Sequence, residues 1–360
     1  MRQREPLGDA IHVLTILLTS ATASVMALAA PLPGFERNRY FDEQVVTYTF
    51  DAGAGAPGSQ PASATSRPAA TVRVHINAPS AEAFDPGKPL RIVLYALPNG
   101  NSIEQTVGRQ RAEGVDWHFY IQHIGAQTRR LREAVTDRNI VVAYVEANVE
   151  GIGKSWPRWR QTYPDSGERI LKLIDSIRSR FPGQPGTVDL LAHSGGGSLL
   201  FGFLNQVDRI PDWIGRIVWL DANYGYSDDD RHGDKLIEWL RRSPEHYLGV
   251  IAYDDRRIQV NGKPVIGPEG GTYRRTHTMV DRLRRDMAVT GIAEPAFARF
   301  RALDGRVEII ILDNPDNAIL HTVLVEKNGY LHALTFGTPH ENKAGTFWGD
   351  IAYEKWIQPD

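Results

Sequence analysis

The sequence predicts an α/β fold in which helices cover both faces of a mainly parallel sheet. Short apolar segments rich in β-branched residues alternate along the chain with segments of helical periodicity, as expected when helices connect successive parallel strands. The 360 residues are 42% hydrophobic and 23% charged, a balance typical of a globular protein with a large core. The formal net charge of −2 gives no reason to expect a nucleic acid as partner.

The expected strands are short apolar runs, which suits strands that are covered on both faces. Between them, a helical pattern over Ser166–Phe181 places its apolar residues on one face, and Ser166 is its expected N-cap. The strands are expected at 44–50, 71–79, 91–97, 139–147, 187–193, 216–222, 247–254 and 306–313.

The N-terminal segment, residues 1–30, has the pattern of a secretory signal peptide. Arg2 and Arg4 precede an apolar stretch, which ends in small residues with Ala27 and Ala29 in A-x-A spacing. We therefore expect an exported protein, periplasmic or secreted, with no stable membrane insertion once the signal is removed. The alternative is that this segment is retained as a membrane anchor.

Residues 31–360 are expected to form a single domain. Within it, residues 52–70 are rich in Ala, Gly, Pro and Ser, a composition that cannot bury a core and predicts a flexible loop. This loop lies between two expected strands, so it predicts a long hairpin connection. The chain has no cysteine, which excludes disulfides, thiolate catalysis and cysteine metal sites.

The segment LLAHSGGGSLLF at 190–201 places Ser194 between an expected buried strand and an apolar helix. A nucleophilic serine occupies such a strand–turn–helix corner in the G-x-S-x-G motif, where the tight turn requires small neighbours. Here Ala192 replaces the first glycine and Gly196 supplies the second. The amide of Gly195 opens the helix and is a candidate donor to an oxyanion. The alternative is a glycine-rich turn with an incidental serine.

Over Thr71–Phe336 the sequence resembles the α/β-hydrolase superfamily, which includes serine esterases and lipases. The phrases ALPNGNSIEQTVG, AHSGGGS, AYDDRR and HTVLVEKNGYLHALTFGT also resemble an exported bacterial group within it. The resemblance implies a sheet of about eight strands and a catalytic triad in the chain order serine, acid, histidine.

In that chain order the base follows the last expected strand, 306–313, and His321 is the first histidine beyond it. His321 precedes a helical stripe of apolar residues, which would leave it in a loop at the carboxyl edge of the sheet. The alternative base is His332, which would take this place if Asn328-Gly329 marked a turn just before it.

The acid is expected after the strand at 247–254, where Asp254 and Asp255 adjoin. Asp255 lies further into the loop and is therefore preferred to Asp254. Asp221, one strand earlier, is the remaining candidate, because some hydrolases take their acid there. Since Asp254 and Asp255 adjoin, at least one of them is expected to cap a helix or to form a salt bridge in the loop.

The second part of an oxyanion hole is expected where an apolar strand ends in Pro98-Asn99-Gly100-Asn101. Esterases and lipases carry backbone donors at this point of the chain. We therefore expect the amides of Asn99 and Gly100 to join that of Gly195. The alternative is a plain turn that ends the strand.

Three further residues are candidates for the substrate pocket. Gln105 could donate a hydrogen bond from its side-chain amide. Trp156 and Trp159 follow the strand at 139–147 and could stack on a sugar or an aromatic acyl group. The alternative for both tryptophans is packing against the edge of the sheet.

These observations together predict a serine hydrolase, with a carboxylic ester as the expected substrate. The ester would be a small molecule or a polymer, and catalysis would need no cofactor and no metal, since the histidines lack the spacing of a metal-binding motif. The alternatives are a serine peptidase or amidase on the same fold, and a non-catalytic binding protein on a hydrolase scaffold.

Overall fold

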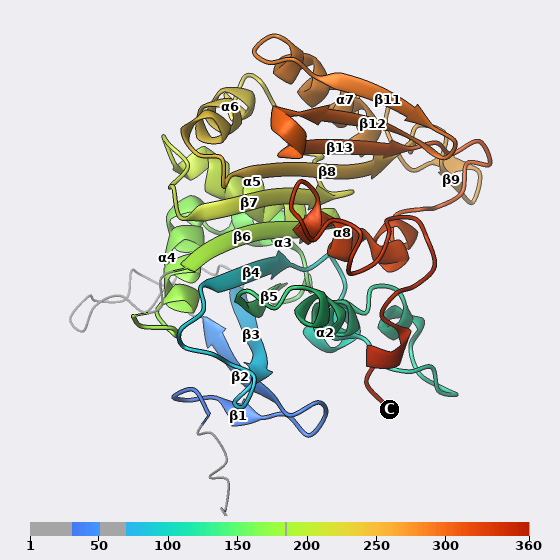
Figure 1. The fold of residues 1–360 in the computed structure, drawn as a ribbon. Coiled ribbons are helices and arrows are strands. Elements are labelled where there is room, and N and C mark those ends of the chain that lie inside the picture. The colour runs from blue at the N-terminus through green and yellow to red at the C-terminus, as the bar shows by residue number, and fades with distance from the viewer. Residues whose placement is uncertain (1–30, 51–69, 184–185, 360) are drawn as a thin grey trace, which may run out of the picture.

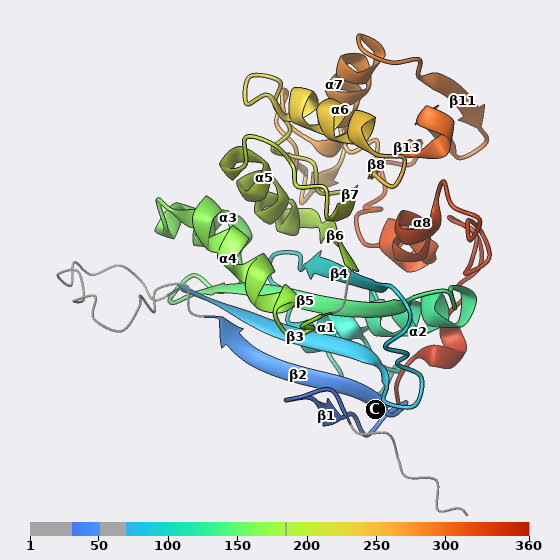
Figure 2. The same ribbon diagram turned by 60° about the vertical axis from the view of Figure 1, so that its left-hand side comes forward.

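The computed structural model describes residues 31–50, 70–183 and 186–359. One large sheet runs through this part of the chain, and helices pack on both of its faces (Figures 1 and 2). The expected signal segment 1–30 lies outside the described residues, as does nearly all of the expected loop at 52–70. Within the described ranges, no helix has the length and apolar character needed to cross a membrane.

The centre of the sheet consists of consecutive parallel strands that are almost completely buried. Their burial on both faces explains why they appear in the sequence as apolar runs without polar alternation. In sheet order they are β5 (Asn139–Val149), β4 (Leu90–Ala96), β6 (Gly186–His193), β7 (Ile214–Leu220), β8 (Tyr247–Tyr253) and β13 (Val307–Leu312).

Antiparallel strands extend this centre at both edges, so the sheet is mixed and has eleven strands in the described chain rather than the expected eight or so. Three of them, β1, β11 and β12, were not predicted. They are short, or too exposed and charged to show as apolar runs. The edge strands are β1 (Glu36–Arg37), β2 (Glu43–Phe50) and β3 (Ala70–Ser80) on one side, and β12 (Phe297–Ala302) and β11 (Thr290–Glu294) on the other.

Two apolar clusters, one on each face of the sheet, form the core. Alternate residues of β4 show the division, because Ile92 and Leu94 belong to one cluster and Val93 and Tyr95 to the other. The first face is covered by α3 (Trp156–Thr162), α4 (Ser166–Arg178), α5 (Gly197–Gln206), α6 (His232–Arg242) and α7 (Thr272–Arg284), and the second by α1 (Ile103–Val107), α2 (Ile124–Ala134) and α8 (Tyr330–Thr335).

Shorter elements complete the described chain. The expected helix at 166–181 is present as α4, but its N-cap is Asp165, so Ser166 is its first residue rather than its cap. The short elements are the 3-10 turns Trp117–Tyr120, Ser194–Gly196, Leu303–Gly305 and Glu354–Trp356, the π-helical turn Val325–Gly329, and the small pair β9 (Gln259–Val260) and β10 (Lys263–Pro264).

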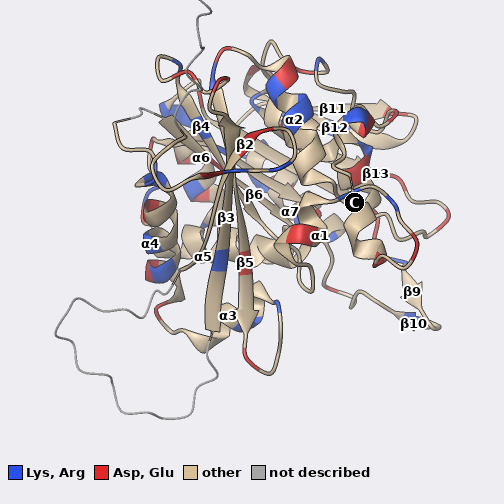
Figure 3. Cartoon of the chain, turned by 90° about the horizontal axis from the view of Figure 1, so that it is seen from below, with Lys and Arg blue, Asp and Glu red and all other residues tan. Residues whose placement is uncertain are grey.

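Charged side chains also fix parts of the fold. The neighbouring strands β3 and β5 each carry a charged segment, basic on β3 and acidic on β5 (Figure 3), where Arg73 Nη2 donates to Glu146 Oε2 at 2.8 Å. Glu146 also accepts from the backbone N–H of Ile103 at 2.8 Å. This carboxylate therefore anchors the start of α1 to the sheet.

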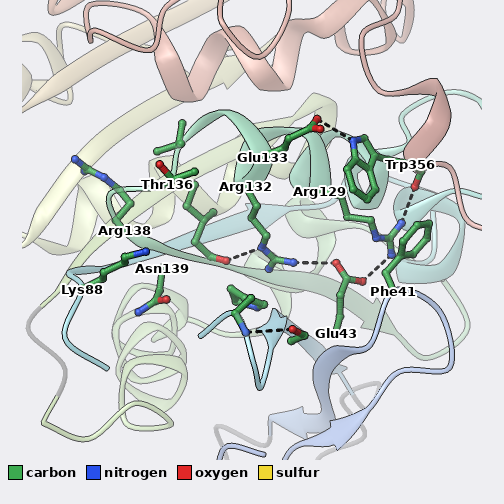
Figure 4. A pocket seen from close by; sticks show the side chains of 15 residues that line it. Phe41, Glu43, Lys88, Arg129, Arg132, Glu133, Thr136, Arg138, Asn139 and Trp356 are labelled. Atoms are coloured by element: carbon green, nitrogen blue, oxygen red, sulfur yellow. Dashed lines mark hydrogen bonds and ion pairs between the residues drawn. The ribbon is translucent and has the colours of Figure 1, made fainter. Parts of the chain in front are cut away.

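A cavity of about 460 Å³ lies at the amino ends of β4 and β5, the edge of the sheet opposite to that of Ser194. Beside it, the buried Glu43 accepts hydrogen bonds from Arg129 Nη2 at 2.7 Å and Arg132 Nη1 at 2.8 Å (Figure 4). Both guanidiniums belong to α2. This ion cluster holds β2 to α2, so its role is in the fold.

Candidate active site

Ser194 lies on a tight turn between β6 and α5, as the sequence predicted. Its φ angle of 54° is in the left-handed region, which non-glycine residues rarely adopt and which is concentrated at functional sites. The neighbouring glycines are required by close packing, because a Cβ at Gly196 would collide with the carbonyl oxygen of Ala96, and one at Gly197 with that of Ala222. The turn is therefore pressed between the ends of β4 and β7.

His321 lies in the loop that follows β13, beside this turn. The His193 Nε2–H, immediately before Ser194, donates to the backbone oxygen of His321 at 2.9 Å, and the two ring centroids are 4.7 Å apart. Burial holds the pKa of His193 well below its usual value, with a further contribution from His321, so His193 is neutral. Ser194 Oγ makes no hydrogen bond with another described residue, and such contacts often tighten only when substrate binds.

The carboxylate that contacts His321 is Asp221, through a hydrogen bond between His321 Nδ1 and Asp221 Oδ2. Asp221 is fully buried and directly follows β7 with a φ angle of 46°. Asp255, the acid preferred from the sequence, is not brought to His321, because its Oδ2 accepts instead from the Thr272 backbone N–H at 2.8 Å.

The other acidic candidate is also occupied elsewhere. Asp254 Oδ2 forms an ion pair with Arg256 Nη2 at 2.7 Å, which lowers the pKa of the carboxyl group. This is the salt bridge within the loop that the sequence analysis expected of one member of the adjacent pair. The parallel strands β7 and β8 end side by side, so several carboxylates reach the same edge of the sheet.

His332 is not part of this arrangement. It lies in α8, is 2% exposed, and its Nε2 is 3.1 Å from Glu308 Oε1. Burial, and next the charge of Arg299, lower the pKa of His332 to about 3. Asn328 has a φ angle of 63° and leaves helical geometry, so the chain does turn just before α8. A helix rather than a strand follows this turn, so the segment after His321 is not a hairpin.

The expected oxyanion donors are only partly in place. The Gly100 N–H donates to the Lys154 carbonyl at 3.0 Å and is therefore not a free donor. Asn99 packs so closely on the serine turn that a Cβ at Gly195 would collide with its side chain. Its own backbone N–H has no acceptor within the described part of the chain. The amides of Gly195 and Asn99 are thus the two that remain for a ligand.

The three expected pocket residues serve the fold instead. Gln105 caps α1 by accepting from the Ser102 N–H at 2.8 Å, and its Nε2 donates to Asp116 at 2.9 Å. Trp156 and Trp159 are each 1% exposed and pack edge to face in the core, with ring centroids 5.4 Å apart. Buried indoles cannot stack on a ligand, so the alternative of packing holds for both.

Four large apolar side chains in the connections between strands are exposed instead. Trp117, Ile152, Tyr224 and Ile319 are between 38% and 60% exposed. Trp117 lies in the 3-10 turn between α1 and α2, and the other three lie in the loops that follow β5, β7 and β13 respectively. The sequence analysis missed them because each is a single apolar residue in a polar loop, and only the parallel sheet brings those loops to one edge.

No protein-family model matches the sequence, and no curated protein sequence matches it. Solved structures with a similar fold include a ferulic acid esterase, at 12% identity, a TM-score of 0.39, and coverage of 79% of this chain and 95% of that one. The siderophore hydrolase EstB from Aspergillus nidulans is 10% identical, with a TM-score of 0.38 and coverage of 78% and 97%.

A third similar structure is a cold-adapted esterase from an Arctic intertidal metagenomic library. It is 13% identical, with a TM-score of 0.34, and the match covers 69% of this chain and 83% of that chain. Likenesses as distant as these assign no residue. Any role of Ser194, His321 and Asp221 therefore rests on the geometry of this chain alone.

Proposed function

We propose that this chain is an α/β hydrolase and that it hydrolyses carboxylic esters through Ser194, His321 and Asp221. The observation that carries the proposal is the meeting of three features at one edge of the sheet. These are a serine held in a left-handed turn, a histidine beside it, and a buried carboxylate on the imidazole Nδ1. Serine, histidine and acid in this relation form a nucleophile, its base and the group that orients the base.

The proposed reaction proceeds in two steps. Ser194 Oγ attacks the ester carbonyl carbon while His321 Nε2 takes the hydroxyl proton, and the Nδ1–H bond to Asp221 stabilises the imidazolium. His321 then returns the proton to the leaving alcohol, which leaves an acyl-enzyme. Water, deprotonated by His321, attacks the acyl carbon, releases the carboxylic acid and restores Ser194.

The oxyanion of each tetrahedral intermediate would be bound by the backbone amides of Gly195 and Asn99. The close packing of the Asn99 side chain on Gly195 supports this assignment, since it shows that the two residues are neighbours at the serine turn. The start of α5 adds the positive end of a helix dipole at the same place.

The apolar side chains at the carboxyl edge favour a substrate with an apolar or aromatic part. Trp117, Ile152, Tyr224 and Ile319 all lie in connections that leave the carboxyl ends of strands, the edge that carries Ser194. Such side chains bind an acyl or alcohol group by burying its apolar surface.

The proposal is tested by labelling and turnover with Ser194→Ala and a matched control, Ser198→Ala. Ser198 is half-buried like Ser194 and lies one turn further along the same segment. Wild type and Ser198→Ala should react with a fluorophosphonate and hydrolyse p-nitrophenyl esters. Ser194→Ala should do neither, with a loss of about 10⁴ to 10⁶ in rate.

Two results would contradict the proposal. Turnover that survives in Ser194→Ala would show that Ser194 is not the nucleophile. Absence of both labelling and turnover in the folded wild type would indicate a non-catalytic scaffold. A parallel panel of p-nitroanilides separates ester from amide chemistry, and faster amide cleavage would make the protein an amidase.

A further inference from the structure

Behind Asp221 lies a second buried carboxyl group that the proposed mechanism does not use. Asp255 is 1% exposed and stands at the start of the loop after β8. Its Oδ2 accepts from the backbone N–H of Thr272, the first residue of α7, at 2.8 Å. Its carboxyl group is also wedged against Gly271, where a Cβ would lie 2.6 Å from Asp255 Oδ1. Asp255 is therefore fixed to the start of α7 through Oδ2.

The Thr272 side chain connects the two carboxyl groups. Thr272 is fully buried, and its hydroxyl is hydrogen-bonded to Asp221 Oδ1 while lying 3.3 Å from Asp255 Oδ2. A hydroxyl has one proton, so it can donate to only one of the two. The closer contact is with Asp221, the carboxylate that also receives His321 Nδ1 on its other oxygen.

We propose that Thr272 and Asp255 are positioning residues for the triad, with Thr272 holding Asp221 Oδ1 so that Oδ2 faces His321, and Asp255 holding Thr272 in place. This inference rests on the proposed function for its effect on turnover. Both residues act through Asp221 and neither touches the substrate.

The charges around the pair agree with this arrangement. Burial raises the pKa of Asp255, and the charge of Asp221 acts in the same direction. The other ionisable groups that face the pair are Tyr224, Tyr253 and Arg256. Both tyrosines have raised pKa values and stay neutral, and Arg256 is bound by Asp254.

The first test uses Thr272→Val, Thr272→Ser and the control Thr335→Val, which removes a buried hydroxyl from α8. Without the Thr272 hydroxyl, Asp221 is no longer held with Oδ2 towards His321, so it stabilises the imidazolium less. We therefore expect Thr272→Val to lower kcat by about tenfold and to move the acidic limb of kcat/KM to lower pH. Thr272→Ser and Thr335→Val should match wild type in both respects.

The second test uses Asp255. Asp255→Asn keeps an acceptor for the Thr272 N–H, so its kcat should stay within about threefold of wild type, whereas Asp255→Ala should resemble Thr272→Val. If Thr272→Val does not fold, the comparison of Asp255→Asn with Asp255→Ala still tests whether these residues position Asp221. A loss in Asp255→Asn as large as that in Asp221→Asn would overturn the inference and make Asp255 the charged member of the triad.

A spectroscopic test needs no substrate, so it separates this inference from the proposed function. The His321 Nδ1 proton, bonded to Asp221, should give a low-field proton NMR signal. The signal should move upfield or broaden in Thr272→Val and Asp255→Ala, and be unchanged in Thr335→Val. If it is unchanged in all of them, with kcat and the pH profile as in wild type, Thr272 and Asp255 do not position Asp221.

Discussion

Two of the histidine–carboxylate pairs formed by histidines after the last strand have opposite surroundings. In the pair of His321 and Asp221 the histidine side chain is 24% exposed and the carboxylate is fully buried. In the pair of His332 and Glu308 the side chains are 2% and 1% exposed. The exposure of the histidine side chain thus distinguishes two pairs whose histidines were both candidates in the sequence.

The charge on each carboxylate differs as well. Glu308 also forms ion pairs with Arg299 and, at 2.9 Å, with Arg301, so its charge is already compensated. Asp221 has no arginine or lysine partner in the described chain. A carboxylate whose charge is compensated by arginines does little to stabilise the protonated form of its histidine. An uncompensated carboxylate stabilises the imidazolium. Such a pair therefore indicates a candidate base only where the histidine is accessible to a proton donor and where its carboxylate carries an uncompensated negative charge.

The largest expected effect comes from replacing each of the two histidines, His321 and His332, by alanine. His321→Ala should reduce ester turnover by about 10⁴ to 10⁶ with the melting temperature little changed. His332→Ala should leave kcat close to wild type and lower the free energy of unfolding by about 2 kcal/mol, because it empties a buried site. If the His332→Ala variant were well folded but inactive and the His321→Ala variant were active, His332 rather than His321 would be the base.

The same division between an effect on activity and an effect on stability is expected for the two carboxylates, Asp221 and Glu308. Asp221→Asn should lower kcat by about 10⁴, since the amide no longer holds the required tautomer of His321. Glu308→Gln should destabilise the protein by about 3 kcal/mol, because it leaves two arginines without their buried partner. Urea unfolding and p-nitrophenyl ester kinetics on both variants check this, and equal losses of kcat would contradict it.

A smaller effect is expected from the hydrogen bond that holds the His321 loop. His193→Phe removes the donor to the His321 carbonyl and should lower kcat by about fivefold to tenfold. The matched control is His246→Phe, because His246 is another buried histidine bonded to a carbonyl, that of Trp239 at 2.6 Å. His246→Phe should affect only stability, and a kcat for His193→Phe equal to that of the control would show that His193 does not position the loop.

The last effect is the contribution of His332 to the pH dependence of stability. The pKa of His332 is about 3 in the folded protein against about 6.5 unfolded, so below that unfolded value only the unfolded state binds the proton. Stability should therefore fall as the pH drops from about 6.5 towards 3, by up to about 1.4 kcal/mol per pH unit from this group. Urea titrations of wild type and His332→Asn should differ by this slope, and parallel slopes would mean that His332 is not buried in its neutral form.

The strands and the serine turn could be predicted because their signals are local. A strand covered on both faces must be apolar throughout, and β4 to β8 satisfy this within seven to eleven residues each. The hairpin of β11 and β12 gave no such signal, since β11 is almost wholly exposed. The extent of the sheet was therefore underestimated at its edges, where burial no longer constrains the sequence.

The candidate pocket was the least predictable part. Trp156 and Trp159 follow β5 on the correct side, and nothing in their local sequence distinguishes stacking on a ligand from packing in the core. Their burial results from α3 lying against α5, a contact between segments about 40 residues apart. The exposed residues of the edge, such as Tyr224 and Ile319, are distant in sequence and meet only through the strand order.

By itself the sequence determined that Ser194 would stand on a tight turn at the end of a buried strand, and that His321 would precede a helix after the last strand. Both are consequences of periodicity and of the conformational limits of neighbouring residues. Only the tertiary structure decided which carboxylate meets His321. Asp221 and Asp255 end neighbouring parallel strands, and their local sequences do not set the direction of either side chain. That direction is set by Thr272 at the start of α7 and by the His321 ring, contacts that exist only once the sheet has formed.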